Sequence, residues 1–262
     1  MLYYRQFYCL MEKLFRFFLQ PHCLRKAVVF SLLFLGFNTA QAQCPPNIDF
    51  EMGDFTGWKC YNQTGYLGGA PNPVLVPAPI PGEHVVLSVP PGNGLDPYGD
   101  FPQNCPNGSG HSIRLGFTTF GQHVDRVSYT FTIPPTQNTY SLIYHYALVL
   151  NDGGTNHTAL TQPKFIISTY NITDGIPLPC QLPEINIATN LPGFFTGHPA
   201  PNNSVVKCRN WAANSLNLDG LAGKTIELSF TVTGCGLNGG SHFGYAYIDG
   251  FCEECTGSSL GS

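Results

Sequence analysis

Short segments in which apolar and polar residues alternate are the sequence feature that most limits how this chain can fold. In 127–133 (VSYTFTI) every second residue is apolar, and 225–232 repeats the pattern. A period of two places neighbouring side chains on opposite faces of a β-strand, so each segment predicts a strand with one buried face. The segments 140–150, 165–170 and 85–89 are apolar on both faces and rich in β-branched and aromatic residues, which favours strands covered on both sides.

Turn-forming residues separate these segments. The stretches 90–94, 106–110 and 151–154 consist of Pro, Gly, Asn, Asp and Ser. Only 211–218 would allow a turn of helix, and the strands show no β-α-β alternation. The sequence therefore predicts an all-β fold, namely an antiparallel β-sandwich of the jelly-roll type.

The first 42 residues differ in composition from the rest. Arg25 and Lys26 precede an apolar run over 27–37, and Ala40-Gln41-Ala42 follows it. This arrangement is typical of a secretory signal peptide cleaved before Gln43, and the run is too short to span a bilayer. We expect 1–42 to be a signal peptide, 43–255 to form a single β-sandwich domain, and 256–262 to be a flexible tail or the start of a linker.

Charged residues are few and mostly acidic after residue 42. This part holds seven Lys and Arg against fifteen Asp and Glu, a net charge near −8. Nucleic acids and anionic membrane surfaces attract basic proteins, so the balance argues against both as partners. No further segment is apolar enough to predict a membrane span. We expect a secreted, extracellular chain, with its oligomeric state left open.

Eight cysteines follow the expected cleavage site, and an even number in an exported chain favours disulfide bonds. Each bond would stabilise the fold by roughly 2–4 kcal/mol, mainly by restricting the unfolded chain. The cysteines predicted to form this disulfide staple are Cys44, Cys60, Cys105, Cys180, Cys208, Cys235, Cys252 and Cys255.

The Cys252-Glu253-Glu254-Cys255 stretch could in principle be a redox or zinc motif. A redox pair belongs at a helix N-terminus, where the dipole lowers a thiol pKa. Here the pair follows a predicted strand, and Glu253 and Glu254 would raise the thiol pKa. The chain contains no second Cys-x-x-Cys for a four-cysteine zinc site. We expect each cysteine to pair elsewhere, one of them with Cys44.

Asp96 and Asp100 lie four residues apart in a Gly- and Pro-rich loop. As a catalytic pair for glycoside hydrolysis they would need one raised pKa and a separation of about 5–10 Å. As structural residues they would fix a turn. Between these two alternatives is a binding role, in which Tyr98 stacks on a sugar and an aspartate accepts hydrogen bonds from its hydroxyls.

Histidines supply the second set of candidates. No His-Glu-x-x-His or other close zinc spacing is present, which argues against a metallohydrolase. We expect His157 and His242 to converge with Gln162 and Lys164 in a binding site, although each is also explained as a hydrogen-bonded loop residue. Trp211 completes the predicted ligand contacts, with the core as its alternative location.

Four motifs in the same order carry a family resemblance: NIDFEMGDFTGW (47–58), DPYGDFPQNCPNGSGHSIRLG (96–116), HTALTQPKF (157–165) and GGSHFGYAYID (239–249). Together they resemble the N-terminal jelly-roll, galactose-binding-like β domain of Bacteroidetes secreted cell-surface proteins. Those proteins also carry PKD repeats and C-terminal domains for gliding motility or type IX sorting. In jelly-roll binding modules the first and last strands lie side by side, and a structural Ca²⁺ often lies between them. The resemblance therefore implies a calcium site at Glu51 and Asp249; the alternative is that Glu51 caps a turn and Asp249 accepts hydrogen bonds from local backbone amides.

The sequence thus predicts a secreted, non-catalytic recognition or adhesion module for a carbohydrate or another extracellular polymer. Two alternatives stay open. One is a polysaccharide hydrolase or lyase that uses the loop carboxylates, and the other is a ligand-free structural cap of a larger surface protein.

Overall fold

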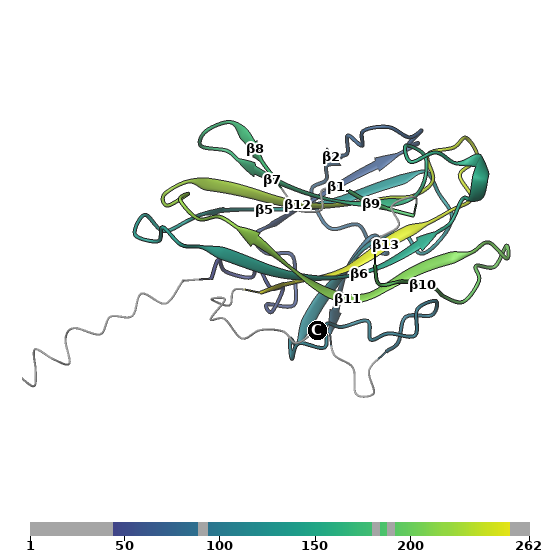
Figure 1. Cartoon of the computed structure of the whole chain (residues 1–262), viewed down its shortest axis with the longest axis horizontal. Coiled ribbons are helices and arrows are strands. Elements are labelled where there is room, and N and C mark those ends of the chain that lie inside the picture. The colour runs from purple at the N-terminus through teal and green to yellow at the C-terminus, as the bar shows by residue number, and fades with distance from the viewer. Residues whose placement is uncertain (1–43, 89–93, 180–183, 188–191, 252–262) are drawn as a thin grey trace, which may run out of the picture. The chain divides into compact units, whose positions relative to one another are not determined.

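The structure, a computed structural model, describes residues 44–88, 94–179, 184–187 and 192–251, with only the backbone of Phe251 (Figure 1). Its regular elements are β-strands apart from a single 3-10 turn in these ranges, η1 (Gly154–Asn156). The predicted all-β class is therefore confirmed. None of the helical structure described here reaches the length and hydrophobicity needed to cross a membrane.

The strands form two antiparallel sheets, which Figure 1 shows as two layers. Sheet A has the order β2-β1-β5-β12-β7-β8, with β9 also paired to β7. Its strands are β1 (Trp58–Thr64), β2 (Val74–Leu75), β5 (His123–Thr132), β7 (Lys164–Asn171), β8 (Ile176–Leu178), β9 (Glu184–Asn186) and β12 (Thr225–Thr233). Sheet B has the order β10-β11-β6-β13-β4-β3. Its strands are β3 (His84–Ser88), β4 (His111–Gly116), β6 (Ser141–Asn151), β10 (Phe194–Thr196), β11 (Val206–Asn217) and β13 (Gly244–Phe251).

The core between the sheets contains the alternating residues that the sequence pattern selects. The apolar residues of 127–133 and 225–232 all belong to this core: Val127, Tyr129, Phe131, Ile133, Ile226, Leu228, Phe230 and Val232. Strands β5 and β12 pair with Val127 opposite Phe230, so the two sets lie side by side. The prediction that 165–170 is covered on both faces is wrong, because Ser168 and Tyr170 on β7 are exposed.

The N-terminal motif 47–58 closes one part of this core. The Asn47 side chain donates hydrogen bonds to the carbonyls of Asp54 (3.1 Å) and Thr56 (2.9 Å), which folds the segment back on itself. Trp58 donates its indole N–H to the Asn47 carbonyl (3.0 Å), and its ring stacks on Phe50 with centroids 4.6 Å apart. Trp58 is therefore a core residue, and the aromatic motif serves packing.

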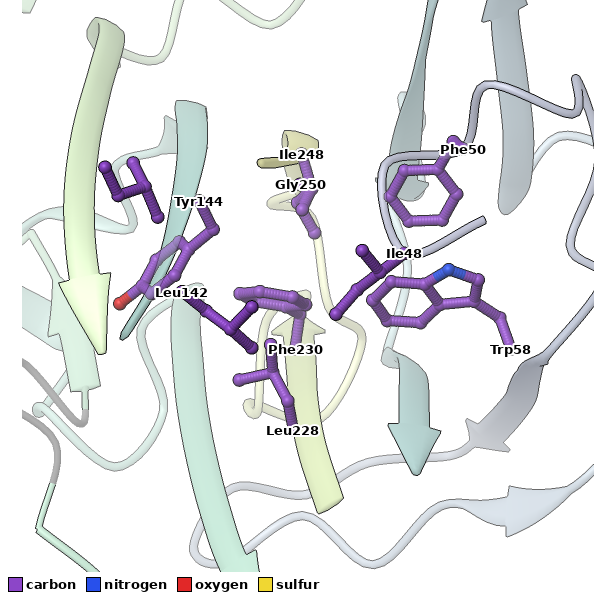
Figure 2. Close-up of a pocket in the computed structure, with 10 residues that line it drawn as sticks. Ile48, Phe50, Trp58, Leu142, Tyr144, Leu228, Phe230, Ile248 and Gly250 are labelled. Atoms are coloured by element: carbon purple, nitrogen blue, oxygen red, sulfur yellow. The ribbon is translucent and has the colours of Figure 1, made fainter. Parts of the chain in front are cut away.

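The space between the sheets does not form a ligand cavity at this point. A void of about 10 Å³ lies among Ile48, Phe50, Trp58, Leu142, Ile143, Tyr144, Leu228, Phe230, Ile248 and Gly250 (Figure 2). Such a volume is close to the minimum for a single water molecule, and its lining is almost wholly apolar. This void therefore has no room for a ligand larger than water.

Two expectations about the topology are wrong. The possible helical turn at 211–218 lies mostly in β11, where pairing with β6 over Val206–Asn217, interrupted by a bulge between Arg209 and Ala212, overrides the local pattern. The first and last strands are also not neighbours, since β1 pairs with β2 and β5 in sheet A and β13 pairs with β4 and β6 in sheet B.

The segment before β1 nevertheless reaches the end of β13. A Cβ placed on Gly250 would lie 2.3 Å from the Ile48 carbonyl oxygen, so the two backbones are in direct contact there. Glycine at position 250 is required by this close approach, because a side chain would displace the N-terminal segment.

Candidate functional site

The eight residues predicted to contact a ligand lie in three places. Asp96, Tyr98, Asp100 and Trp211 lie on or beside the face of sheet B that points away from sheet A. His157, Gln162 and His242 lie in the connections that join β6 to β7 and β12 to β13. Lys164 begins β7 in sheet A.

The first place centres on an apolar group that we call the outer cluster. It consists of Phe101, Ala147, Val149, Ala200, Val206, Cys208, Phe243, Tyr245 and Tyr247, with Leu87, Tyr98 and Trp211 packed against it. On β13, Tyr245 and Tyr247 belong to the outer cluster, while Ala246 and Ile248 belong to the core between the sheets. Tyr245 and Tyr247 are therefore buried, but beneath loops and not between the sheets.

Asp96 anchors the loop that covers the outer cluster. Its Oδ1 accepts hydrogen bonds from the backbone N–H groups of Tyr98 (2.9 Å) and Gly99 (2.7 Å). Its Oδ2 accepts from the hydroxyls of Tyr245 (2.7 Å) and Tyr247 (2.8 Å). Burial, and then the nearby Asp96 carboxylate, raise the pKa of both tyrosines. With an exposed fraction of 1%, Asp96 joins the loop to β13 through four donors.

The other three residues in this place remain partly or largely accessible. Asp100 and His198 form an exposed pair, with Oδ2 and Nε2 2.7 Å apart. The Tyr98 ring lies 5.1 Å from that of Phe243, and burial raises the pKa of its hydroxyl. Trp211 is half-buried, donates its indole N–H to the Pro102 carbonyl (2.7 Å) and has its ring 6.2 Å from Tyr247.

A groove of about 390 Å³ begins beside Trp211. Its lining is partly polar and consists of Gly94, Pro102, Asn104, Cys105, Pro106, Gly108 and Ser109. Trp211 is not itself part of this lining, but its indole N–H donates to the carbonyl of Pro102, which is, so the indole is held close to the groove. Apart from Trp211 at its edge, none of the groove residues was among the predicted ligand contacts, although the Pro-Asn-Gly-Ser-Gly turn at 106–110 marks the loop in the sequence.

A second groove, of about 480 Å³, lies beside β1 and β2. Its lining consists of Asp54, Phe55, Thr56, Trp58, Lys59, Cys60, Leu75, Val76, Pro77, Ala78 and Pro79. Three of these residues are Pro or Ala, and the charged members are only Asp54 and Lys59. The sequence analysis did not select this surface.

Glu51 and Asp249 both contact the loop 107–111. Glu51 Oε1 accepts the backbone N–H groups of Gly110 and His111 (both 2.9 Å) and the Ser109 hydroxyl. Partial burial alone would raise the pKa of Glu51, but these hydrogen bonds from Ser109, His111 and Gly110 lower it. Asp249 Oδ2 accepts from Asn107 (3.1 Å).

Asp249 is fully buried, and its Oδ1 has no hydrogen-bond partner among the described residues. Burial raises the pKa of Asp249 to about 7 against the lowering effect of Asn107 and Ser109. Asp249 Oδ1, which has no hydrogen-bond partner in the described part of the chain, is an oxygen that could bind Ca²⁺. The three hydrogen bonds to Glu51 Oε1 instead use lone pairs that a cation would need. The calcium site stays a prediction.

In the second place, His157 and His242 converge as expected. Their rings are perpendicular, with centroids 4.7 Å apart. Burial and the neighbouring His157 lower the pKa of His242, against a weaker opposite effect of Asp152. Gln162 holds the same connection by accepting from the Gly153 N–H (3.0 Å) and donating to Asp152 Oδ1 (3.3 Å).

Cys235 is the residue of this place that the sequence did not assign. Its Sγ lies 3.0 Å from His157 Nε2, and its backbone N–H donates to the His242 carbonyl (3.1 Å). The sequence does contain a signal for this contact, because Cys235 stands seven positions before His242 in a Gly-rich turn. The prediction that Cys235 forms a disulfide bond led away from it.

Lys164 does not join this group through any described contact. Its side chain is 2% exposed, and its ammonium nitrogen lies 3.5 Å from Glu184 Oε2 and donates to the Gly69 carbonyl (3.3 Å). These contacts tie β7 to β9 and to the loop after β1, which is a structural role.

One further polar group lies within the fold. Asn62 donates to Glu83 Oε2 (2.6 Å) and to Asp125 Oδ1 (3.0 Å), and His84 lies beside them. Burial and the neighbouring Glu83 raise the pKa of Asp125 to about 8. Asp125 therefore keeps its proton to a higher pH than an ordinary aspartate does.

The predicted disulfide staple is not supported by the described residues, since no disulfide bond joins any two of them. Cys60 lies in the core between the sheets, Cys208 in the outer cluster and Cys235 in the β12–β13 connection. Burial raises the pKa of Cys60, Cys105 and Cys208 to about 12, so these thiols are protonated. Cys180, Cys252 and Cys255 lie outside the described residues, and so does any pairing with them.

The described part of the chain thus defines an antiparallel two-sheet β-sandwich with a loop-covered outer face. No family of known proteins and no curated protein matches the chain in sequence. Among solved structures it is similar to the carbohydrate-binding module TmCBM61 in complex with β-1,4-galactotriose (12% identity, 80% of this chain, 97% of that chain, TM-score 0.36).

Two further solved structures are also similar to this chain. One is the mannan-recognising module TmCBM27, at 12% identity over 66% of this chain and 99% of that one, with a TM-score of 0.29. The other is the K1 cleaved adhesin domain of Lys-gingipain from Porphyromonas gingivalis W83, at 11% identity over 74% and 99%, with a TM-score of 0.29. Similarities this distant assign neither a family nor a ligand to this chain.

Proposed function

We propose that the chain is a secreted, non-catalytic module that binds a carbohydrate or a similar extracellular polymer. The observation that carries the proposal is the groove of about 390 Å³ beside Trp211. The hydrogen bond to Pro102 holds the indole in place, while Trp211 as a whole is only half-buried. A fixed aromatic face next to a partly polar groove suits a sugar ring, which offers C–H groups for stacking and hydroxyls for hydrogen bonds.

Polar side chains near the groove supply hydrogen-bonding groups. Asn104 and Ser109 line it, and the exposed Asp100–His198 pair lies on the same loop-covered face. The net charge near −8 after residue 42 favours neutral over acidic glycans. A shallow groove predicts weak binding at each site, which multivalent display on a polymer or a cell surface would strengthen.

The alternative of a glycoside-cleaving enzyme depends on Asp96 or Asp100. Asp96 is 1% exposed and accepts four hydrogen bonds, so a substrate would have to displace a tyrosine hydroxyl to reach it. Asp100 is largely exposed, so it lacks the buried, apolar surroundings that a catalytic general acid usually has. The burial and contacts of the two carboxyl groups thus support binding over catalysis.

The test is retention of the full chain on a polysaccharide panel that includes β-1,4-galactan, mannan and cellulose, with new reducing ends measured in parallel. We expect retention on at least one polymer without new reducing ends. Trp211→Ala should weaken that retention about tenfold or more, equivalent to roughly 1.4 kcal/mol. Tyr170→Ala, which removes an exposed aromatic ring from sheet A, is the matched control and should bind as the wild type does.

Three results would count against the proposal. Product formation would establish the enzyme, and absence of retention on every polymer and on a glycan array would favour a structural cap. Equal binding by the Trp211→Ala and wild-type chains would move the site away from this groove.

A further inference from the structure

His157, Cys235 and His242 bring three ligand atoms of the kinds that bind transition metals into one small volume. One ring nitrogen from each histidine and the cysteine sulfur all lie within 4.8 Å of one another. We call these three residues the His–Cys cluster. Cys235 is 1% exposed and the two histidines are half-buried, so the cluster lies just below the surface.

The backbone around the His–Cys cluster fixes two of the ligands independently of any ion. Cys235 and His242 flank the β12–β13 connection, and the Cys235 N–H donates to the His242 carbonyl (3.1 Å). The Leu237 N–H also points at Cys235 Sγ (3.5 Å). Cys235 and His242 are therefore placed by the turn that joins the two strands.

The third ligand comes from a different connection between the sheets. His157 directly follows η1 in the β6–β7 connection, and its Nε2 lies 3.0 Å from Cys235 Sγ. Gln162 braces this connection through Gly153 and Asp152. The Nδ1 atoms of His157 and His242 are buried and have no hydrogen-bond partner among the described residues. Among the described residues, the ring nitrogen of His157 that faces Cys235 is Nε2.

We propose that the His–Cys cluster binds a single Zn²⁺ ion. Two imidazoles and one thiolate match the preference of zinc for nitrogen and sulfur ligands and exclude Ca²⁺ and Mg²⁺, which prefer oxygen. In a tetrahedral site with bonds of about 2.0–2.3 Å, neighbouring ligand atoms are about 3.3–3.7 Å apart. His157 Nε2 lies 3.0 Å from Cys235 Sγ, and all three ligand atoms lie within 4.8 Å of one another. These distances are close enough to the tetrahedral spacing that small side-chain rotations would complete the site.

Such an ion would connect the two sheets at one end of the sandwich. The β6–β7 connection passes from sheet B to sheet A, and the β12–β13 connection passes from sheet A to sheet B. An ion that binds only the folded form raises the stability of that form by mass action. Zinc would therefore stabilise the fold, which is the role expected of the predicted disulfide bonds. The fourth coordination position would be left to water or an added ligand.

The experiment uses the full chain, without a histidine tag, treated with a chelator and then titrated with Zn²⁺ or Co²⁺. We expect one equivalent of Zn²⁺ per chain, a higher melting temperature, and a sulfur-to-Co²⁺ charge-transfer band. Cys235→Ser should abolish the band, and His157→Gln and His242→Gln should each weaken Zn²⁺ binding at least tenfold. Cys105→Ser and His198→Gln, which change a thiol and an imidazole elsewhere, should bind as the wild type does.

Two results would overturn the proposal. One is an unchanged Co²⁺ band and stoichiometry in Cys235→Ser, which would place any bound metal elsewhere. The other is Cys235 found in a disulfide bond by peptide mapping of the unreduced chain. Circular dichroism of each variant separates lost binding from lost folding, and the two glutamine variants keep the test valid if the serine variant does not fold. Glycan retention is measured separately, so either proposal can fail alone.

Discussion

Asp96 and His157 were both predicted to contact a ligand, and the structure surrounds them in opposite ways. Asp96 accepts four hydrogen bonds, each of 2.9 Å or shorter, and has no spare capacity. His157 has a buried Nδ1 without a described partner and an Nε2 that faces a thiol. A buried polar group whose bonds are complete holds the fold, whereas one with unused bonds costs stability until something binds. The number of hydrogen-bond partners therefore distinguishes a structural side chain from a ligand-binding one better than burial does.

The largest loss of stability should follow from replacing Asp96, the residue that accepts all four hydrogen bonds of its network. Asp96→Ala leaves the Tyr245 and Tyr247 hydroxyls buried without an acceptor and releases the loop backbone at Tyr98 and Gly99. Breaking a buried charged network by removing one partner costs about 3–5 kcal/mol. We expect a loss of this size in the free energy of unfolding, measured by urea denaturation.

The matched variants remove the donors and keep the carboxylate. Tyr245→Phe and Tyr247→Phe should each cost only about 1–2 kcal/mol, because Asp96 retains three donors in either case. A loss below about 1 kcal/mol for Asp96→Ala would show that the network does not stabilise the fold, and would contradict the structural role given to Asp96.

Asp249 is the intermediate case, with one oxygen partnered and the other not. Burial raises its pKa from an ordinary 3.8 to about 7, so between these values the folded chain binds a proton that the unfolded chain has lost. The free energy of unfolding should therefore fall as pH rises from about 4 to about 7, by at most about 1.4 kcal/mol per pH unit from this group. Urea denaturation at several pH values measures the slope.

Asp249→Asn isolates this contribution and tests the calcium prediction. Asp125 also has a raised pKa and gives a slope of the same sign, but it is present in both chains, so the difference between the two curves belongs to Asp249. Parallel curves would show that Asp249 is not protonated in the folded state. If Ca²⁺ binds at Glu51 and Asp249, adding it in place of a chelator should keep Asp249 ionised and flatten the wild-type curve alone.

A pair of glycine substitutions compares the packing of the two regions. A Cβ on Gly197 would lie 2.3 Å from the Tyr98 carbonyl oxygen and 2.7 Å from Cys208 Sγ, at the edge of the outer cluster. A Cβ on Gly153 would lie 2.4 Å from the His157 ring, which can rotate away. Gly197→Ala should cost about 1–3 kcal/mol, as overpacking does, and Gly153→Ala clearly less. Urea denaturation compares the two.

The same pair sharpens the assignment of the His–Cys cluster. Gly153→Ala should weaken Zn²⁺ binding because it displaces His157 without changing a ligand, whereas Gly197→Ala should leave the affinity unchanged in the folded fraction. If Gly197→Ala weakened Zn²⁺ binding and Gly153→Ala did not, the assignment of the metal site to the His–Cys cluster would be contradicted.

The fold could be predicted from the sequence to the extent that it depends on local patterns. Alternation in 127–133 and 225–232 selects the core residues because a strand's period of two does not depend on the rest of the chain. The pairing in β11 could not be predicted, because the strand form of 211–217 depends on β6, more than 50 residues earlier. The same reason applies to the outer cluster, whose covering loops come from distant parts of the chain.

The candidate sites were predictable as residue types but not as groups. His157 and His242 stood in selected motifs, and their convergence is seen in the structure. Cys235 was missed because an even number of cysteines in an exported chain suggests disulfide bonds, and only the fold shows which thiol faces an imidazole. Asp96 was selected as an accessible carboxylate, whereas its four donors come largely from β13 and from a turn that the sequence alone does not orient.

The smallest effect on stability should come from the accessible carboxylate of the outer face. Asp100 has a positive φ of 54°, which Asn tolerates better than Ala, so Asp100→Asn removes the charge without adding backbone strain. Because Asp100 and His198 are both largely exposed, losing their pairing should change the free energy of unfolding by at most about 0.5 kcal/mol. Weaker glycan retention in Asp100→Asn, with unchanged retention in His198→Gln and unchanged stability in both, would place the Asp100 carboxylate in contact with ligand. Equal retention of the wild type, Asp100→Asn and His198→Gln would confine recognition to Trp211 and the groove. A loss of stability well above about 0.5 kcal/mol would show that the Asp100 side chain is not free to bind a ligand.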